Sequence, residues 1–418
     1  MVQRMRKMKD SGIEWIGEIP EGWEVGQIGQ LYSERRTKVS DKDYPPLSVT
    51  MRGILPQLST AAKTDAHDDR KLVCKGDFAI NSRSDRRGSC GISEQDGSIS
   101  LINTVLQPRG EMNPGYYNWL FHTSMFADEF YKWGHGIVDD LWTTGWSDMK
   151  KIGVPVPSKC EQKQLAEHLN FECSNIDTIL SKTRSSIEEY KKLKQAVITQ
   201  AVTKGVRGKR EMKDSGVEWI GEIPVDWTIQ RFARVAEVKS NLVSPDNYLE
   251  YPQISPENIE KDSGKLLLPC KTVGEVGIIS GNHLFYKGQI LYSKIRPKLN
   301  KVCIAPFDGL CSADMYPIET NNDTRYIMYC ILSNGFLQQV SMITENRVKM
   351  PKINQTELSK LLVAIPNFLA EQKEIADHLD AKCAEIDGLI AKKEQLVKEL
   401  ESYKRSLIYE VVTGKREV

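Results

Sequence analysis

The chain contains two copies of one plan. Residues 8–23 read MKDSGIEWIGEIPEGW and residues 212–227 read MKDSGVEWIGEIPVDW, so thirteen of the sixteen positions are identical. A second pair follows, EQKQLAEHLNFECSNID at residues 161–177 and EQKEIADHLDAKCAEID at residues 371–387. Each copy therefore consists of a short head segment, a body of diverged sequence and a helical segment. A repeated frame around diverged bodies predicts a scaffold that presents two different binding surfaces.

Length and composition narrow the class of protein. The 418 residues exceed what one hydrophobic core usually holds, which predicts two or more domains. The formal net charge is only +1, so a nucleic-acid site would have to come from local clusters or from partners. Nine cysteines without a Cys-x-x-Cys pair indicate a reducing compartment, and no apolar run approaches the ~20 residues that span a bilayer. We therefore expect a cytoplasmic protein without a membrane contact.

The segment after each body is predicted to be a long helix. Apolar residues recur there at steps of three and four, flanked by Glu, Lys and Gln, which is typical of a coiled-coil seam. The two seams are Leu165, Leu169, Ile176, Leu180, Ile187, Tyr190, Leu193, Val197 and Ala201, and Ile375, Leu379, Ile386, Ile390, Val397, Leu400, Tyr403, Leu407 and Val411. Two such helices in one chain can cover each other, antiparallel if the halves are related by a pseudo-twofold axis. The alternative is a single solvated helix.

The junctions between the copies resemble each other. The first helical segment runs into GKREMKDSG at residues 208–216, and the sequence closes with GKREV at residues 414–418. The start of the sequence, MRKMKDSG, would continue that closing segment. We therefore expect the two ends of the sequence to lie together.

The bodies, residues 27–156 and 228–365, have a mixed α/β pattern. Short β-rich runs such as DFAINS and QILYSKI alternate with Gly, Pro and Asp turns, and helical stretches lie near residues 116–131 and 326–340. Only KGDF from Lys75 and KGQI from Lys287 can be aligned between them. We expect a shared fold with different surfaces.

Catalytic motifs are absent from the sequence. The nearest string to the Asn/Asp-Pro-Pro-aromatic motif of adenine methyltransferases is Tyr44-Pro45-Pro46, in the wrong order, and there is no G-x-x-x-x-G-K-[ST] phosphate loop. Pro245-Asp246 resembles the start of a nuclease motif, but no acid-x-Lys follows it. We expect no catalysis by this chain alone.

Two repeated features have competing interpretations. His168 with Cys173, and His378 with Cys383, could suggest zinc, but an i,i+5 spacing turns about 140° around a helix, which favours packing. The head tryptophans Trp15, Trp23, Trp219 and Trp227 could stack on bases. Their identical placement in both copies favours a structural joint or a partner-docking patch instead.

Basic clusters are the candidate nucleic-acid site. SKIRPKLNK at residues 293–301 and NSRSDRRGS at residues 81–89 both follow the aligned KG-x-apolar strand. Their side chains are of the types that bind phosphates and read base edges, although each cluster alone could be a solvated loop. Arg347, Lys349 and Lys352 form a weaker third cluster. The candidate DNA-binding residues are Arg52, Asn81, Arg83, Arg86, Arg87, Ser293, Lys294, Arg296, Lys298, Lys301, Arg347 and Lys349.

The repeated heads, the EQ-x-x-(I/L)-A helix starts and the closing TGKREV resemble the specificity subunit of type I restriction-modification enzymes, over essentially the whole chain. The resemblance implies a mixed α/β fold with two target recognition domains, separated by two long helices in an antiparallel, pseudo-twofold coiled coil. The implied domains are residues 1–157 and 208–366, each a head with a recognition domain, and the spacer helices are residues 158–207 and 367–418.

The resemblance also implies a function. Each recognition domain would read one half of a bipartite, asymmetric site on double-stranded DNA. Two methylation subunits carrying S-adenosylmethionine would modify the N6 of adenine, and restriction subunits using ATP and Mg would complete the complex. This chain would hold no cofactor or metal. Alternatives are a specificity module of another restriction-modification class and a pseudo-dimeric coiled-coil scaffold without a DNA role.

Overall fold

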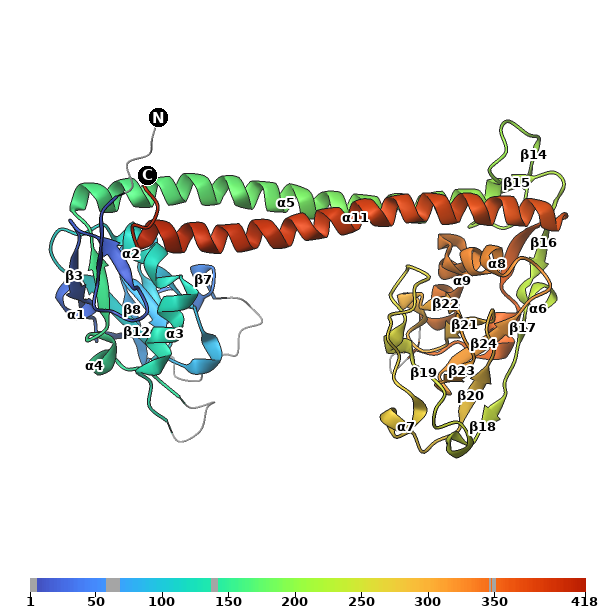
Figure 1. The fold of residues 1–418 in the computed structure, drawn as a ribbon, viewed down its shortest axis with the longest axis horizontal. Helices are drawn as coiled ribbons and strands as arrows, with labels where there is room; N and C mark the ends of the chain where they lie inside the picture. Colours follow the sequence, from blue (N-terminus) through green and yellow to red (C-terminus); the bar gives the residue numbers. More distant parts are fainter. Residues whose placement is uncertain (1–5, 58–67, 137–141, 346, 348–350) are drawn as a thin grey trace. The chain divides into compact units, whose positions relative to one another are not determined.

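The structure, a computed structural model, describes residues 6–57, 68–136, 142–345, 347 and 351–418 (Figure 1). The chain divides into two compact units, which we call unit 1 (residues 1–183 and 395–418) and unit 2 (residues 184–394). Two long helices, α5 (Lys159–Lys204) and α11 (Leu369–Val412), each contribute one part to each unit. The expected mixed α/β fold is confirmed.

Unit 1 places short antiparallel sheets beside the first part of α5 and the last part of α11. The head forms the hairpin of β1 (Met8–Asp10) and β2 (Glu18–Pro20), and the next pair is β3 (Glu24–Gln27) with β13 (Gly153–Val156). The larger sheets are β10 (Cys90–Ile92), β9 (Phe78–Asn81), β12 (Asn103–Pro108) and β4 (Tyr32–Glu34), and β11 (Gly97–Ile99), β8 (Arg70–Val73) and β5 (Lys38–Val39). A hairpin of β6 (Leu47–Thr50) and β7 (Gly53–Pro56) packs on β10. The short helices are α1 (Ile28–Leu31), α2 (Pro114–Phe121), α3 (Ser124–Lys132), α4 (Trp146–Met149) and the 3-10 turn η1 (Ser84–Arg86).

Unit 2 repeats this plan. Its head hairpin is β14 (Met212–Asp214) with β15 (Glu222–Pro224), followed by β16 (Trp227–Arg231) with β25 (Leu362–Pro366). The sheets are β17 (Glu237–Val238), β24 (Met315–Glu319), β21 (Ile290–Ser293) and β22 (Val302–Ile304), and β18 (Leu242–Val243), β20 (Asn282–Phe285), β23 (Gly309–Cys311) and β19 (Gln253–Ile254). The helices are α6 (Phe232–Val235), α7 (Val273–Val276), α8 (Thr324–Leu332), α9 (Asn334–Thr344) and α10 (Gln355–Ser359), with 3-10 turns η3 (Pro245–Asn247), η4 (Pro256–Asn258) and η5 (Pro297–Leu299). Figure 1 shows α8 and α9 between α11 and the strands.

The two bodies share one strand frame. With an offset of 212 residues, β8, β9, β10 and β11 coincide with β20, β21, β22 and β23. Their pairing also agrees, because β9 lies between β10 and β12 as β21 lies between β22 and β24. The sequences on this frame differ, for example FAIN in β9 and ILYS in β21. The frame is therefore kept while the residues that it carries change.

The long helices pair antiparallel inside each unit. In unit 2, Lys194 of α5 donates to Asp387 of α11 at 2.9 Å, and in unit 1, Lys404 of α11 donates to Asp177 of α5 at 2.6 Å. The roles of the helices are exchanged between the two contacts: α5 supplies the lysine in unit 2, and α11 supplies it in unit 1. Burial raises the pKa of Asp387, but hydrogen bonds from Lys265 and Lys194 outweigh it and hold the pKa below its ordinary value.

The predicted seam is wrong at one position of each helix. Leu193 and Tyr403 are 48% and 47% exposed. The next residue, Lys194 or Lys404, turns toward the partner helix instead, and Lys194 is only 5% exposed. A lysine can bury its aliphatic stem while its ammonium meets a carboxylate, which a search for apolar periodicity cannot detect.

The head segments join the long helices through matching contacts, which are buried in unit 2 and partly buried in unit 1. The indole N–H of Trp23 donates to Glu161 at the start of α5, and that of Trp227 donates to Glu371 at the start of α11, each at 3.2 Å. Arg6 and Arg210 donate to the same two carboxylates. Trp23 and Trp227 are buried, so the expectation of a structural joint is confirmed for them.

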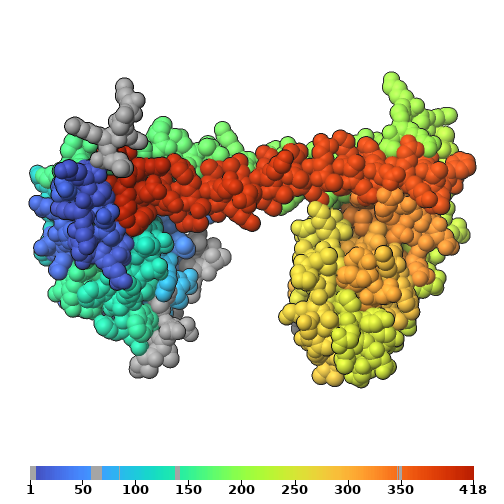
Figure 2. All heavy atoms as spheres, in the orientation of Figure 1, coloured from blue at the N-terminus to red at the C-terminus, as the bar shows by residue number. Residues whose placement is uncertain are grey.

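The head segment and the segment that follows α11 lie together in unit 1, as expected. Tyr409 and Lys415 both donate to the carbonyl of Ile16, at 3.2 and 3.0 Å. Figure 2 shows the end of α11, in red, against the head segment, in blue. None of the helices in the described part of the chain has a stretch apolar and long enough for a membrane crossing.

The Glu161 contact predicts a pH dependence of stability. Burial raises the pKa of Glu161, but hydrogen bonds from Arg6, Trp23 and Ser158 outweigh it and lower the pKa. A lowered pKa in the folded state stabilises the fold above the unfolded-state pKa of about 4.3, and this contribution is lost as the pH falls through the folded-state pKa. Glu161→Gln should therefore unfold at lower urea than the unsubstituted chain at pH 7 and at a similar urea concentration near pH 3. A constant difference across that pH range would contradict the assignment.

Candidate nucleic-acid interface

The two basic clusters occupy the same place in the shared frame. The unit 1 basic loop, residues 82–89, connects β9 to β10, and the unit 2 basic loop, residues 294–301, connects β21 to β22. Main-chain hydrogen bonds close both loops in the same way, from Asn81 N to Ser89 O at 2.9 Å and from Ser293 N to Lys301 O at 3.0 Å. Each loop also contains one 3-10 turn. The expectation that the clusters lie in loops at comparable positions is confirmed.

In the unit 1 basic loop the three arginines differ in their surroundings. Arg87 lies 3.1 Å from the carboxylate of Asp128 and stacks over the ring of Tyr131 at 4.9 Å. Arg86 lies 3.5 Å from its neighbour Asp85, and both side chains are largely exposed. Arg83 is exposed, and its carbonyl accepts a hydrogen bond from the Tyr131 hydroxyl. Arg83 and Arg86 are therefore better placed than Arg87 to meet a ligand.

In the unit 2 basic loop the cations point outward at its centre. Arg296 and Lys298 are exposed on either side of the buried Pro297. Lys294 lies over the ring of Tyr316 at 5.2 Å, and Lys301 donates to the carbonyl of Pro256 at 2.7 Å. Arg296 and Lys298 are thus the cations of this loop that are most open to a ligand.

Two of the candidate residues are buried and have a structural role. Asn81 and Ser293 are 7% and 2% exposed and are equivalent residues at the ends of β9 and β21. The Asn81 carboxamide accepts from the main-chain N–H of Arg83, and the Ser293 hydroxyl donates to the carbonyl of Ile295. Both side chains hold the start of a basic loop and do not project from it.

Two further candidates, Arg52 and Arg347, border the basic loops. Arg52 is exposed at the tip of the β6–β7 hairpin, and the neighbouring Gly53 packs against Gly91 of β10, the strand that follows the unit 1 basic loop. In unit 2 an isolated bridge joins Lys352 to Ile295, which brings the third basic cluster beside the loop. Arg347 there is paired with Glu357, and Lys352 with Asp314 at 2.9 Å. Lys349 lies outside the described residues.

The structure adds one residue that the sequence reasoning missed. An isolated bridge joins Arg83 to Thr143, and a second joins Thr143 to His135. The His135 side chain is 77% exposed and lies 3.5 Å from Asp148. His135 stands far from any basic cluster in the sequence, so only the fold could reveal that it borders the loop.

A buried histidine lies behind the unit 2 basic loop. His283 of β20 is 4% exposed, and burial and then the positive charge of Lys294 lower its pKa. The imidazole is therefore neutral near pH 7 and adds no charge to the surface.

Two substitutions of Asn300, in the unit 2 basic loop, are expected to differ in their effect on the free energy of unfolding. Asn300 is buried with φ 45°, a conformation that glycine and asparagine tolerate best, and its side chain donates to the carbonyl of Leu332 at 3.2 Å. Gly88, with φ 73°, occupies the equivalent place in unit 1. Asn300→Gly should cost about 1 kcal/mol for the lost hydrogen bond, and Asn300→Ala about 1–2 kcal/mol more for the strained backbone. Urea unfolding of both variants measures this difference, and equal losses would refute it.

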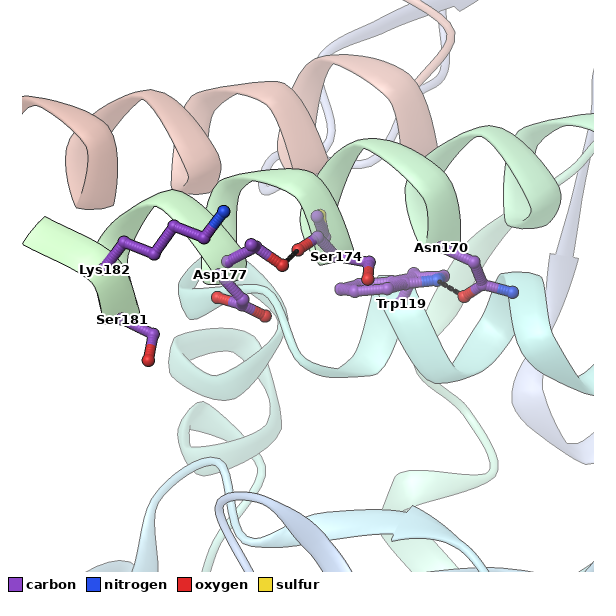
Figure 3. A pocket seen from close by; sticks show the side chains of 8 residues that line it. Trp119, Asn170, Ser174, Asp177, Ser181 and Lys182 are labelled. Carbon is purple, nitrogen blue, oxygen red and sulfur yellow. Dashed lines mark hydrogen bonds between the residues drawn. The ribbon is translucent and has the colours of Figure 1, made fainter.

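A hollow in unit 1 is lined in part by side chains that already pair with other residues. It has a volume of about 590 Å³ and lies between α5 and α2, lined by residues that include Trp119, Asn170, Asp177 and Lys182 (Figure 3). The indole N–H of Trp119 donates to Asn170 at 2.9 Å, and Asp177 is paired with Lys404. Throughout the described part of the chain, no group of three or more His, Cys, Asp and Glu side chains could hold a metal ion.

Comparisons with known proteins agree with one another. A family model described as a type I restriction modification DNA specificity domain matches residues 224–399. The specificity subunit of the type I restriction enzyme EcoDI from Escherichia coli is 37% identical over 257 residues, which are 58% of this chain and 57% of that protein. The match thus spans little more than half of that relative. The MjaVIII specificity subunit from Methanocaldococcus jannaschii is 23% identical over 95% of this chain and 93% of that protein.

Solved structures share the fold. A chain from a structure that concerns complex assembly and conformational transition of the type I restriction-modification system has a TM-score of 0.70 at 11% identity, covering 94% of this chain and 98% of that chain. The HsdS subunit from Thermoanaerobacter tengcongensis has a TM-score of 0.52 at 14% identity, over 95% and 98%. At these identities the likeness concerns the fold alone.

Proposed function

We propose that this chain is a type I restriction-modification DNA specificity subunit, as its likeness to such subunits suggests, and that each of its units reads one half of a bipartite, asymmetric site on double-stranded DNA. One observation carries the proposal. A shared strand frame presents a basic loop at the same place in both units, and the residues of the two loops differ. A common strand frame that carries two different cationic loops is what we expect of two domains that recognise two different DNA sequences.

The residues of the basic loops and their borders would have different roles in DNA recognition. Arg52, Arg83 and Arg86 in unit 1, and Lys294, Arg296 and Lys298 in unit 2, would contact phosphates and base edges in the major groove. The partly engaged cations Arg87, Lys301 and Arg347 would contact the DNA backbone at the borders, and Lys349, outside the described residues, remains a candidate from the sequence alone. Asn81 and Ser293 would position the loops from beneath.

Catalysis would belong to partner chains. Two methylation subunits would bind S-adenosylmethionine and methylate the N6 of one adenine in each half-site, taking the target base out of the helix. Restriction subunits would bind ATP and Mg and complete the nuclease. The recognition domains with their heads would be residues 1–157 and 208–366, and the spacer helices residues 158–207 and 367–418.

The test is the modification that the complex leaves on DNA. The full chain is co-expressed with its methylation subunit in a host that lacks adenine methylation, and the modified positions are mapped across the genome. We expect one interrupted motif with N6-methyladenine in both halves. A single uninterrupted motif would favour a specificity module of another class, and an unmethylated genome despite a stable complex would contradict the proposal.

The long helices predict the effect of a length change. Deleting residues 386–392, one heptad of α11, removes Asp387, which holds Lys194 and Lys265. It also shortens one helix of the antiparallel pair by ~10 Å, at a rise of ~1.5 Å per residue. We expect methylation of the native site to be lost, as measured by protection from the cognate nuclease. Full retention would show that helix length does not set the spacing of the half-sites.

A further inference from the structure

A turn of each body lies beside its basic loop. The unit 1 side turn is residues 100–103, after β11, and the unit 2 side turn is residues 312–315, after β23. A main-chain hydrogen bond closes each turn, from Asn103 N to Ser100 O at 3.1 Å and from Met315 N to Ser312 O at 2.9 Å. The two side turns are therefore equivalent parts of the shared strand frame.

Main-chain hydrogen bonds also join each side turn to the first residue of the basic loop. Ser82 N donates to Ile102 O at 3.3 Å in unit 1, and Lys294 N donates to Asp314 O at 3.0 Å in unit 2. Each basic loop is thus continuous with its side turn. A DNA duplex that meets the cations of a basic loop will therefore lie close to the side turn as well.

The two side turns carry different side chains at their centres. Leu101 and Ile102 are each 38% exposed in unit 1. The equivalent residues of unit 2 are Ala313 and Asp314, and Asp314 is paired with Lys352 at 2.9 Å. Because alanine and aspartate form the same turn with the same main-chain hydrogen bonds, the fold does not require two large apolar residues there. Their exposure also means that they contribute little to a core.

An exposed apolar pair beside a cationic loop suits one feature of DNA. In the major groove, the C5-methyl group of thymine is recognised by apolar contact, whereas the other groups on the base edges are hydrogen-bond donors and acceptors. Phosphates and these polar groups are bound by Arg, Lys, Asn and Ser side chains. An aliphatic side chain that covers a methyl group removes apolar surface of both from water, which favours binding.

We infer that Leu101 and Ile102 are specificity-determining residues of unit 1, which contact the C5-methyl group of a thymine in its half-site. The inference rests on the proposed function and deepens it, because it names a base that unit 1 recognises. Unit 2 presents Ala313 and Asp314 instead, so the side turns add to the difference between the two half-sites.

Replacing thymine by uracil, which lacks the methyl group, tests the inference. The full chain is assembled with its methylation subunit, and its affinity is measured for the mapped site with each thymine replaced in turn. At one position or more, we expect about fourfold weaker binding to the uracil site, as for the loss of about one buried methyl group. The variant Leu101→Ala, Ile102→Ala should bind the thymine and uracil sites equally there. Its melting temperature should be unchanged, because both side chains are exposed.

Two other exposed apolar residues of unit 1 supply the matched control. Val25 and Met125 are 44% and 42% exposed and lie outside the side turn and the basic loop. The variant Val25→Ala, Met125→Ala should keep the preference for thymine. Equal binding of thymine and uracil at every position, or an undiminished preference in the Leu101, Ile102 variant, would overturn the inference and leave the proposed function intact. An unsubstituted complex that does not distinguish the mapped site from a scrambled one would instead refute the proposed function.

Discussion

Replacing Arg296 and Lys298 together by alanine is expected to weaken the binding of the assembled methyltransferase to its target by about 2–6 kcal/mol, roughly 30-fold to 10⁴-fold, if each side chain reads a base. Both side chains are exposed at the centre of the unit 2 basic loop, whereas the neighbouring Lys294 and Lys301 contact Tyr316 and Pro256. Affinity for the mapped site and for a scrambled site, measured over a series of salt concentrations, gives the result.

The salt series separates two ways in which these cations could act. A cation that contacts only phosphate weakens binding to every sequence and lowers the salt slope by about 1 when it is removed. A cation that reads a base reduces the difference between the target and the scrambled site. Lys271→Ala with Lys287→Ala is the matched control, because both lysines are exposed in unit 2 and Lys287 lies in the turn at the other end of β21. Equal losses in both double variants would remove the loop from the interface.

Glu371→Ala is expected to lower the free energy of unfolding by about 3–5 kcal/mol, as is typical when one partner of a buried ion pair is removed. The Glu371 side chain is 1% exposed and accepts from Arg210 and from the indole of Trp227. Arg207 lies 3.7 Å from its other oxygen. Without the carboxylate, the buried indole N–H of Trp227 loses its acceptor, and the Arg210 guanidinium, which is only 17% exposed, keeps Asp226 alone. Urea unfolding of the full chain, followed by tryptophan fluorescence, measures the loss.

Glu161, the residue of unit 1 that corresponds to Glu371, provides the comparison for this prediction. Glu161 makes the same hydrogen bonds with Arg6 and Trp23, but its side chain is 28% exposed and that of Arg6 is 33% exposed. Water can replace a part of what Glu161→Ala removes, so the expected loss is about 1–2 kcal/mol. Glu371→Gln keeps an acceptor for Trp227 and should fall between the two alanine variants. A loss from Glu161→Ala as large as that from Glu371→Ala would show that burial does not govern the strength of this joint.

The internal repeat made several parts of the molecule predictable. The heads, the long helices and the loop positions follow from comparing one half of the sequence with the other, since residues that serve the frame are the same in both. The bodies could not be aligned beyond the KGDF and KGQI turns, because their strands keep length and spacing while almost every side chain changes. Backbone hydrogen bonds define these strands, and a hydrogen bond between main-chain atoms leaves little trace in the sequence.

The candidate interface was predictable as a location but not residue by residue. Charge clustering located both basic loops, yet it could not distinguish Arg296, which points outward, from Ser293, which supports the loop from within. Nor could it show that Arg87 and Arg347 are already paired with acids that are distant in sequence. Exposure and pairing are consequences of tertiary structure. Only the fold therefore separates the cations that are open to a ligand from those that are already paired.

The closure of the two basic loops bears on how such a molecule can change its target. Each loop is fixed at its ends by main-chain atoms, Asn81 N to Ser89 O and Ser293 N to Lys301 O, and these bonds are indifferent to the side chains between them. Substitutions at the exposed loop positions, such as Arg296 and Lys298, should therefore have little effect on folding, unlike substitutions of the buried Asn300. Under the proposed function, natural selection could then change the DNA sequence that is read almost independently of stability. In this architecture, a change of specificity at these positions would cost little free energy of folding.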